Sequence, residues 1–166
     1  MNELEIVEWV RRRSRTHSSI LTGVGDDMAV IAAPTGKLLL SSDLLLDVVH
    51  FDSKIHTFRQ IGRKAVARAL SDCAAMAVQP TAVLVSVALP KDLPSPSVEE
   101  LFQAMHVVAE EFGAGVAGGD TARWDGPLAI DISIAAEPYP GIAPIKRDGA
   151  RINDRLYTTG RLGGSI

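Results

Sequence analysis

The most constraining feature of the sequence is the regular hydrophobic pattern of residues 97–112. Apolar side chains recur there at intervals of three and four, as along one face of an amphipathic helix: Val98, Leu101, Phe102, Met105, Ala109 and Phe112. Ser97 and Glu100 match a capping box, in which a serine and an acid three positions later bind the first free amides of a helix. The pattern predicts a helix that begins near Ser97 and buries one face.

A second helix is predicted for residues 58–78, which are rich in alanine. Four of its apolar side chains stand in helical register: Ile61, Ala65, Ala69 and Met76. Pro80 follows and is expected to end the helix. Residues 3–13 show a shorter pattern of the same kind and predict a short N-terminal helix.

Short apolar runs bounded by turn residues lie between these helical segments and predict strands. They are residues 28–32, 37–42, 44–51, 81–89, 115–117, 128–136 and 155–159. Interleaved strands and helices predict an α+β fold, with a mixed or antiparallel sheet and helices on one face. The 166 residues, 46% of them hydrophobic, are enough for one ordered domain with a real core.

The composition excludes several classes of protein. A net charge of −3 argues against a nucleic-acid partner, because such proteins present a basic face to the phosphate backbone. The single cysteine, Cys73, excludes an intramolecular disulfide framework and a multi-cysteine zinc site. No apolar run approaches the roughly 20 residues of a membrane span, and residues 1–15 lack the apolar stretch of a secretory signal. We therefore expect a cytoplasmic protein without a membrane partner.

Aspartates at the ends of apolar segments are the main chemical feature of the sequence. They are Asp26, Asp27, Asp43, Asp72 and Asp120. Magnesium prefers oxygen ligands and takes one or two carboxylates per ion, with water and phosphate oxygens completing the shell. An aspartate that follows a glycine is, however, often a turn residue that binds backbone amides. Asp72 shares a predicted apolar helix face, where an ion pair with Arg68 is the alternative to a metal. Both interpretations stay open on the residues alone.

Glycines recur where backbone amides would approach phosphate oxygens: Gly23, Gly25, Gly118, Gly119, Gly160, Gly163 and Gly164. The sequence contains no G-x-x-x-x-G-K-[ST] motif and no G-x-G-x-x-G that opens a helix, so a nucleotide site here is neither a P-loop nor a Rossmann site. Among the four histidines, His50 stands out because Asp43 and Asp47 are close to it in sequence.

Six motifs, in this order and spacing, resemble those of the thiamine-monophosphate kinase family. They are residues 23–27 (GVGDD), 41–43 (SSD), 50–51 (HF), 70–76 (LSDCAAM), 118–121 (GGDT) and 147–150 (RDGA). This family belongs to the aminoimidazole-ribonucleotide synthetase superfamily, with selenophosphate synthetase and a hydrogenase-maturation protein. The resemblance implies an N-terminal ATP- and Mg²⁺-binding and dimerisation domain at residues 1–150, and the start of a C-terminal domain at residues 151–166.

The resemblance also implies a function: ATP-dependent phosphorylation of thiamine monophosphate to thiamine diphosphate, by a homodimer whose two sheets pair. It implies Mg²⁺ ligands at Asp27, Asp43, Asp72 and Asp120, with Ser41 and Ser42 assisting. The resemblance implies catalytic roles for Asp43, Asp72 and Asp120. Nucleotide contacts are implied at Gly119, Asp120 and Arg147, and a substrate contact at His50.

Three positions depart from the family pattern: Ala69 replaces an asparagine, Ala77 a glycine and Phe102 a tyrosine. Two alternatives to the kinase remain open. One is a non-catalytic dimerising or nucleotide-binding module, and the other is a different ATP-dependent enzyme of the same superfamily.

Overall fold

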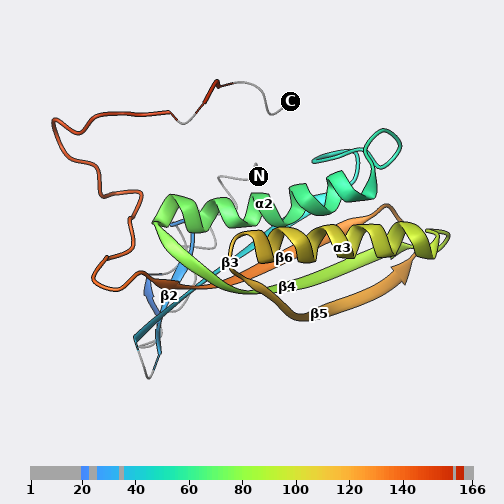
Figure 1. Ribbon diagram of the computed structural model, residues 1–166, viewed down its shortest axis with the longest axis horizontal. Helices are drawn as coiled ribbons and strands as arrows, with labels where there is room; N and C mark the ends of the chain where they lie inside the picture. The colour runs from blue at the N-terminus through green and yellow to red at the C-terminus, as the bar shows by residue number, and fades with distance from the viewer. Residues whose placement is uncertain (1–19, 23–25, 34–35, 159, 163–166) are drawn as a thin grey trace, which may run out of the picture.

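The structure is a computed structural model that describes residues 20–22, 26–33, 36–158 and 160–162. Within these residues, six strands form one mixed sheet and two helices cover one of its faces (Figure 1). The elements are β1 (Ile20–Thr22), β2 (Ala29–Ala33), β3 (Gly36–Leu46), α2 (Phe58–Met76), β4 (Val78–Pro90), α3 (Ser95–Glu111), β5 (Gly115–Trp124) and β6 (Ala129–Pro138). The predicted α+β fold is confirmed, and the helix predicted at residues 3–13 lies outside the described residues.

The strand order in the sheet is β1-β2-β3-β6-β4-β5. β4 and β5 are parallel and joined through α3, as a parallel pair requires a crossover, whereas all other neighbours are antiparallel. No helix within the described part of the chain is both long and apolar enough to cross a bilayer.

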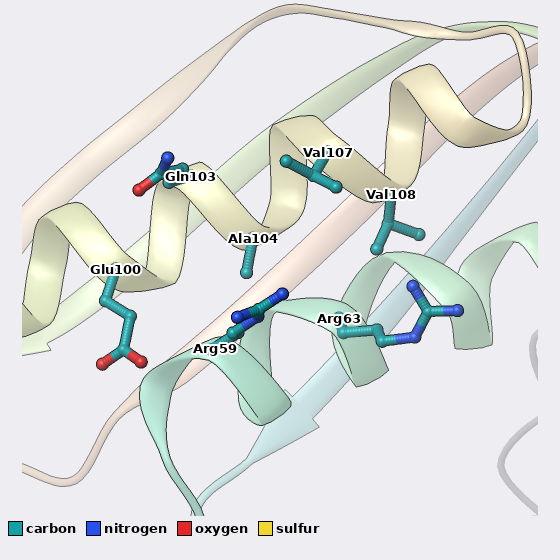
Figure 2. Close-up of a pocket in the computed structure, with 7 residues that line it drawn as sticks. All are labelled: Arg59, Arg63, Glu100, Gln103, Ala104, Val107 and Val108. Atoms are coloured by element: carbon teal, nitrogen blue, oxygen red, sulfur yellow. The ribbon is translucent and has the colours of Figure 1, made fainter.

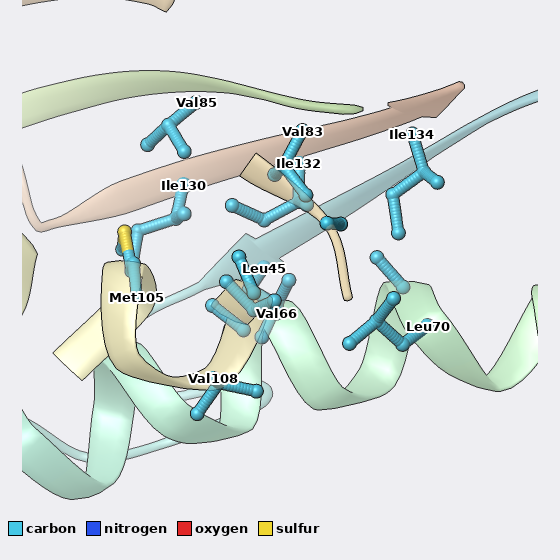
Figure 3. Close-up of a cluster of buried hydrophobic side chains, with 14 of the residues drawn as sticks. Leu45, Val66, Leu70, Val83, Val85, Met105, Val108, Ile130, Ile132 and Ile134 are labelled. Atoms are coloured by element: carbon cyan, nitrogen blue, oxygen red, sulfur yellow. The ribbon is translucent and has the colours of Figure 1, made fainter. Parts of the chain in front are cut away.

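The hydrophobic core lies between the two helices and the face of the sheet that they cover. Successive side chains of a strand point to opposite faces, so every second residue of the central strands is buried. Figure 3 shows these strand residues facing α2 and α3: Leu45, Val83, Val85, Ile130, Ile132 and Ile134. The helices contribute Val66, Leu70, Met105 and Val108. We call the other face of the sheet, which no described helix covers, the open face.

Helix α2 begins at Phe58 behind a capping box that the sequence analysis did not identify. Thr57 accepts a hydrogen bond from the Gln60 amide, and the Gln60 side chain accepts one from the Thr57 amide. The helix ends at Met76, two residues before the predicted end, and Pro80 lies inside β4 rather than in a loop. The predicted helix itself is confirmed.

The capping box predicted at Ser97 is wrong, because α3 begins two residues earlier. Its N-cap is Pro94, which makes no side-chain capping bond, and a second proline occupies the first turn. The Ser97 amide already donates to the Pro94 carbonyl at 3.0 Å, so Ser97 is part of the first turn. Proline suits this turn because its missing N–H would have no helical partner there. The helix itself is confirmed.

Four of the predicted strands differ clearly from the structure. The runs at 37–42 and 44–51 form the single strand β3, which ends at Leu46. A turn follows because Val48 has a φ of 66° and the Asp47 carboxylate accepts the amides of Val48 and Ser53. Strand β5 extends from Gly115 to Trp124 because it pairs with β4 along its length, well beyond 115–117. The strand predicted at 155–159 is wrong for the described residues 155–158, which are exposed and have no partner strand.

The departure at Ala77 has a structural consequence. Ala77 caps α2 in the left-handed conformation, with φ 50° and ψ 53°, where glycine is the residue without steric cost. We expect Ala77→Gly to raise the free energy of unfolding by about 0.5–1 kcal/mol, after the extra entropy of the unfolded glycine is subtracted. The matched control is Ala67→Gly on the exposed side of the same helix, which should lower it by about 1 kcal/mol. Urea denaturation that gave both variants the same sign would contradict this explanation.

Candidate functional site

Three of the predicted aspartates lie near one another at the end of α2, on the helix-covered face of the sheet. Asp43 is on β3, on the same face as the buried Leu39 and Leu45, and Asp72 is in the last turns of α2. Asp27 lies two residues before β2, and its charge, like that of Asp43, is close enough to raise the pKa of Asp72. We call Asp27, Asp43 and Asp72 the carboxylate cluster.

Burial and like charge make Asp72 an unfavourable place for a negative charge. Desolvation raises the pKa of the Asp72 carboxyl above its ordinary value, and the charges of Asp43 and Asp27 raise it further. The Ser41 hydroxyl and Arg147 oppose this rise in the pKa. A cation beside Asp72 would therefore relieve an electrostatic cost that the folded chain carries at neutral pH.

Two arginines supply positive charge to the cluster. Arg147 donates from Nη2 and Nε to Asp27 Oδ1, at 2.5 and 3.1 Å. Arg68 places its Nε 3.6 Å from Asp43 Oδ1, so it pairs with Asp43 rather than with Asp72. Among the described residues Asp72 makes no ion pair, which argues against Arg68 as the alternative to a cation there.

Ser41, beside the carboxylate cluster, has a buried hydroxyl group without a hydrogen-bond partner among the described residues. Its Oγ is buried and is the one buried side-chain polar atom that lacks a hydrogen-bond partner among the residues described. It lies close enough to Asp72 to oppose the rise of its pKa, yet it does not reach ordinary hydrogen-bond geometry. A buried hydroxyl without a partner is costly, so an additional polar or charged ligand would find a donor or acceptor here.

The donor set fits Mg²⁺, which takes hard oxygen ligands and keeps several waters. The cluster offers three carboxylates and one unpaired hydroxyl, and all of these donors are oxygens. In the part of the chain that the structure describes, no three acidic, histidine or cysteine side chains are close enough to hold one ion by themselves. The set therefore suits ions that each bind one or two of the carboxylates and complete their shells with water or phosphate oxygens.

Ser42 and Asp120 are not brought to the carboxylate cluster. Ser42 follows Ser41 on a strand and so points to the open face, where its Oγ donates to Asp131 Oδ1 at 2.8 Å and lies 3.1 Å from Ser133 Oγ. Asp120 lies on β5, in register with Ser86 of β4. Its carboxylate accepts a hydrogen bond from the Thr121 amide at 2.9 Å. This last contact is the backbone-binding role that the sequence left open.

A shallow hollow of about 260 Å³ on the open face is lined by Asp120, Ser86 and Asp131, among others. The sequence analysis missed Asp131. The signal was available, because residues 129–136 alternate between apolar and small or polar side chains, and this alternation assigns Asp131 to the face opposite the isoleucines.

Gly119 and His50 have local structural roles in the chain as it stands. A Cβ on Gly119 would lie 1.8 Å from the Val85 carbonyl oxygen, so glycine allows β5 to approach β4 here. His50 Nδ1 accepts the Leu46 amide at 3.0 Å, and its carbonyl accepts a hydrogen bond from Lys64. Lys64 precedes Asp72 by eight residues, about 12 Å along the helix axis, so His50 lies away from the carboxylate cluster.

Cys73 is adjacent to Asp72 and is buried. Burial raises the pKa of its thiol to about 11, and the charge of Asp72 adds to the rise. A thiolate nucleophile at this position is therefore disfavoured.

A separate groove of about 330 Å³ lies between α2 and α3 (Figure 2). Arg59 and Arg63 line it from α2, and Glu100 and Gln103 from α3. Arg63 is paired with Glu111 at 2.8 Å. None of the residues predicted to form the site lines this groove.

Comparisons with known proteins point to one family. The family model described as AIR synthase related protein, N-terminal domain, matches residues 25–137. The thiamine-monophosphate kinase of Rhodopirellula baltica is 35% identical over 99% of this chain and 54% of its own length. That of Bacillus subtilis is 31% identical over 99% of this chain and 51% of its own. The chain thus spans about half the length of the curated relatives it matches.

A solved structure described as AaThiL complexed with AMPPCP and TMP has the same fold, with a TM-score of 0.78 and 28% sequence identity. The match covers 90% of this chain and 45% of that one.

Proposed function

The chain belongs to the AIR synthase related protein family through its N-terminal domain, and we propose that it forms the ATP- and Mg²⁺-binding half of a thiamine-monophosphate kinase. The complete enzyme would phosphorylate thiamine monophosphate to thiamine diphosphate. The observation that carries the proposal is the carboxylate cluster with its raised Asp72 pKa, next to Arg147. The relatives named as thiamine-monophosphate kinases, and the related structure with AMPPCP and TMP, support this substrate pair.

The proposed reaction is a direct in-line transfer between two bound phosphates, without a covalent phosphoenzyme. Asp27, Asp43 and Asp72 would hold the metal, with the unpaired Ser41 hydroxyl assisting. Bound Mg²⁺ supplies charge neutralisation for phosphate oxygens in such reactions. Arg147 borders a hollow of about 520 Å³ formed by residues 143–150 and Asp154, and a guanidinium there suits two-point binding of a phosphate group.

The remaining predicted contacts belong to the same proposal. Gly119 and Asp120 would contact the nucleotide, and His50 the second substrate. Asp120 and Ser42 would act from the open face, near a second subunit, because both lie on that side of the sheet. A cytoplasmic location is also part of the proposal.

A homodimer through the open face is the proposed assembly. Four leucines on this face are exposed: Leu40, Leu44, Leu46 and Leu84. An apolar patch of this kind on a sheet marks a protein interface more often than bare surface. A second copy of the chain, bringing the same patch, would cover it symmetrically.

Thermal unfolding tests the metal-nucleotide site. At about 100 times its dissociation constant, MgATP should stabilise the native state by about 2.7 kcal/mol, which corresponds to about 5–10 °C in the midpoint. ATP with excess EDTA, and MgCl₂ without nucleotide, should each give a much smaller shift, because ATP without metal leaves the carboxylate charges unneutralised and Mg²⁺ alone binds the cluster more weakly than it does with phosphate oxygens in its shell. An equal shift with ATP in EDTA would contradict the proposed role of the carboxylates.

A further inference from the structure

The chain after β6 returns to the domain at two places. The Ile145 amide donates to the Met76 carbonyl at the end of α2, at 2.9 Å. Arg147 then binds Asp27, 120 residues away in sequence. From residue 146 to residue 158, all other hydrogen bonds of the described chain are local, between residues 146 and 149 or 151 and 154. Among the described residues, the contact with Asp27 is therefore the one hydrogen-bonded link between the sheet and this stretch, which we call the arginine segment (residues 146–158).

The same contact occupies a proposed metal ligand. Both guanidinium donors of Arg147 converge on Oδ1 of Asp27, which leaves this oxygen little capacity for a cation. Arg68, the other arginine beside the cluster, is placed differently. Its Nε lies 3.6 Å from Asp43 Oδ1, and its backbone is part of α2. Arg147 is the more easily displaced charge of the two, because its side chain is 63% exposed and, among the described residues, its segment makes no other hydrogen bond to the sheet or helices beyond that of Ile145.

We propose that Arg147 and Mg²⁺ bind Asp27 alternately, so that metal binding releases Arg147 and the arginine segment from the sheet. The proposal rests on the proposed function only for the presence of a metal at Asp27. When no metal is bound, the Arg147 guanidinium supplies positive charge beside three carboxylates that would otherwise repel one another. Once released, Arg147 is free to bind a phosphate oxygen, so metal and nucleotide each favour binding of the other.

The exposure of the pair sets the size of the expected effect. An ion pair with one partner largely in water typically changes an equilibrium constant by no more than about fivefold. Removing Arg147 should therefore tighten the binding of Mg²⁺ alone by about two- to fivefold, because the metal no longer displaces a competitor.

Calorimetric titration with MgCl₂, without nucleotide, measures this effect. We expect Arg147→Gln to bind Mg²⁺ about two- to fivefold more tightly than the unchanged chain. Arg151→Gln is the matched control, because Arg151 is an exposed arginine of the same segment and makes no ion pair among the described residues. It should leave the Mg²⁺ affinity unchanged, which separates loss of the contact from loss of a nearby charge. Equal affinities in all three proteins, or weaker binding by Arg147→Gln, would overturn the proposal.

Limited trypsin digestion gives a second readout, independent of affinity. Mg²⁺ should speed cleavage after Arg151 and Arg155 in the unchanged chain, since the arginine segment is then released. Arg147→Gln should be cleaved quickly with or without Mg²⁺. Mg²⁺ binding without faster cleavage would overturn the exchange alone and leave the metal site standing. An absence of Mg²⁺ binding in every variant would overturn both the exchange and the metal part of the proposed function.

Discussion

Asp72→Asn is expected to lower the rate of thiamine diphosphate formation by the active kinase about 10²- to 10³-fold. The reason is that the substitution removes a preorganised ionic contact from a site where phosphate charge must be neutralised, and losses of this size are usual for such contacts. Initial rates at saturating MgATP and thiamine monophosphate measure the effect. Asp92→Asn, an exposed aspartate of the loop between β4 and α3, is the matched control and should keep the full rate.

The same variant should be more stable than the unchanged protein in the absence of metal. The pKa of Asp72 is raised in the folded state, so the folded chain binds its proton more tightly than the unfolded chain. Stability from this group is present below its ordinary pKa and is lost as the pH rises through the raised value. The advantage of Asp72→Asn should therefore appear above that range and vanish in acid. A destabilised variant with an undiminished rate would make Asp72 a structural residue instead of a metal ligand.

Leu44→Asp is expected to weaken the proposed homodimer at least about 100-fold. Leu44 is on the open face with 53% of its surface exposed, and a carboxylate buried in an apolar interface costs several kcal/mol. Val107→Asp on α3 is the matched control, since Val107 is 54% exposed but lies on the helix side of the sheet. Sedimentation equilibrium should show a dimer for the control and a monomer for Leu44→Asp at micromolar concentration. A monomeric unchanged protein, or equal behaviour of the two variants, would contradict assembly through the open face.

The sequence predicted the helices well because their apolar residues repeat locally and the same residues fill the core. Ile61, Ala65, Ala69 and Met76 are all buried, as their spacing predicted. The start of α3 was missed because Pro94 and Pro96 favour a helix that begins at Ser95, whereas Ser97 and Glu100 fit a capping box equally well in the sequence. Two local motifs therefore predicted different first residues for the same helix, and the sequence alone did not show which of them the folded chain uses.

The site was harder to predict because it depends on which face of a strand each residue occupies. The sequence predicted Ser41 and Ser42 at the end of one strand and Asp43 between two strands. All three lie within β3, where Ser42 points to the open face and the other two point toward α2. Asp120 likewise lies in a strand because of its long-range pairing with β4. The contact of Arg147 with Asp27 joins the two ends of the described chain, and no local pattern predicts it.

The central claim is that Asp27, Asp43 and Asp72 bind the divalent metal of a nucleotide complex. The most direct test is a crystal structure with Mn²⁺ and a non-hydrolysable ATP analogue, because Mn²⁺ shows its position by anomalous scattering and accepts the same oxygen ligands. We predict anomalous peaks within about 2.3 Å of oxygens from the carboxylate cluster, with phosphate oxygens on the same ions. Peaks confined to the open face beside Asp120 and Asp131, with none at Asp27, Asp43 or Asp72, would contradict the claim.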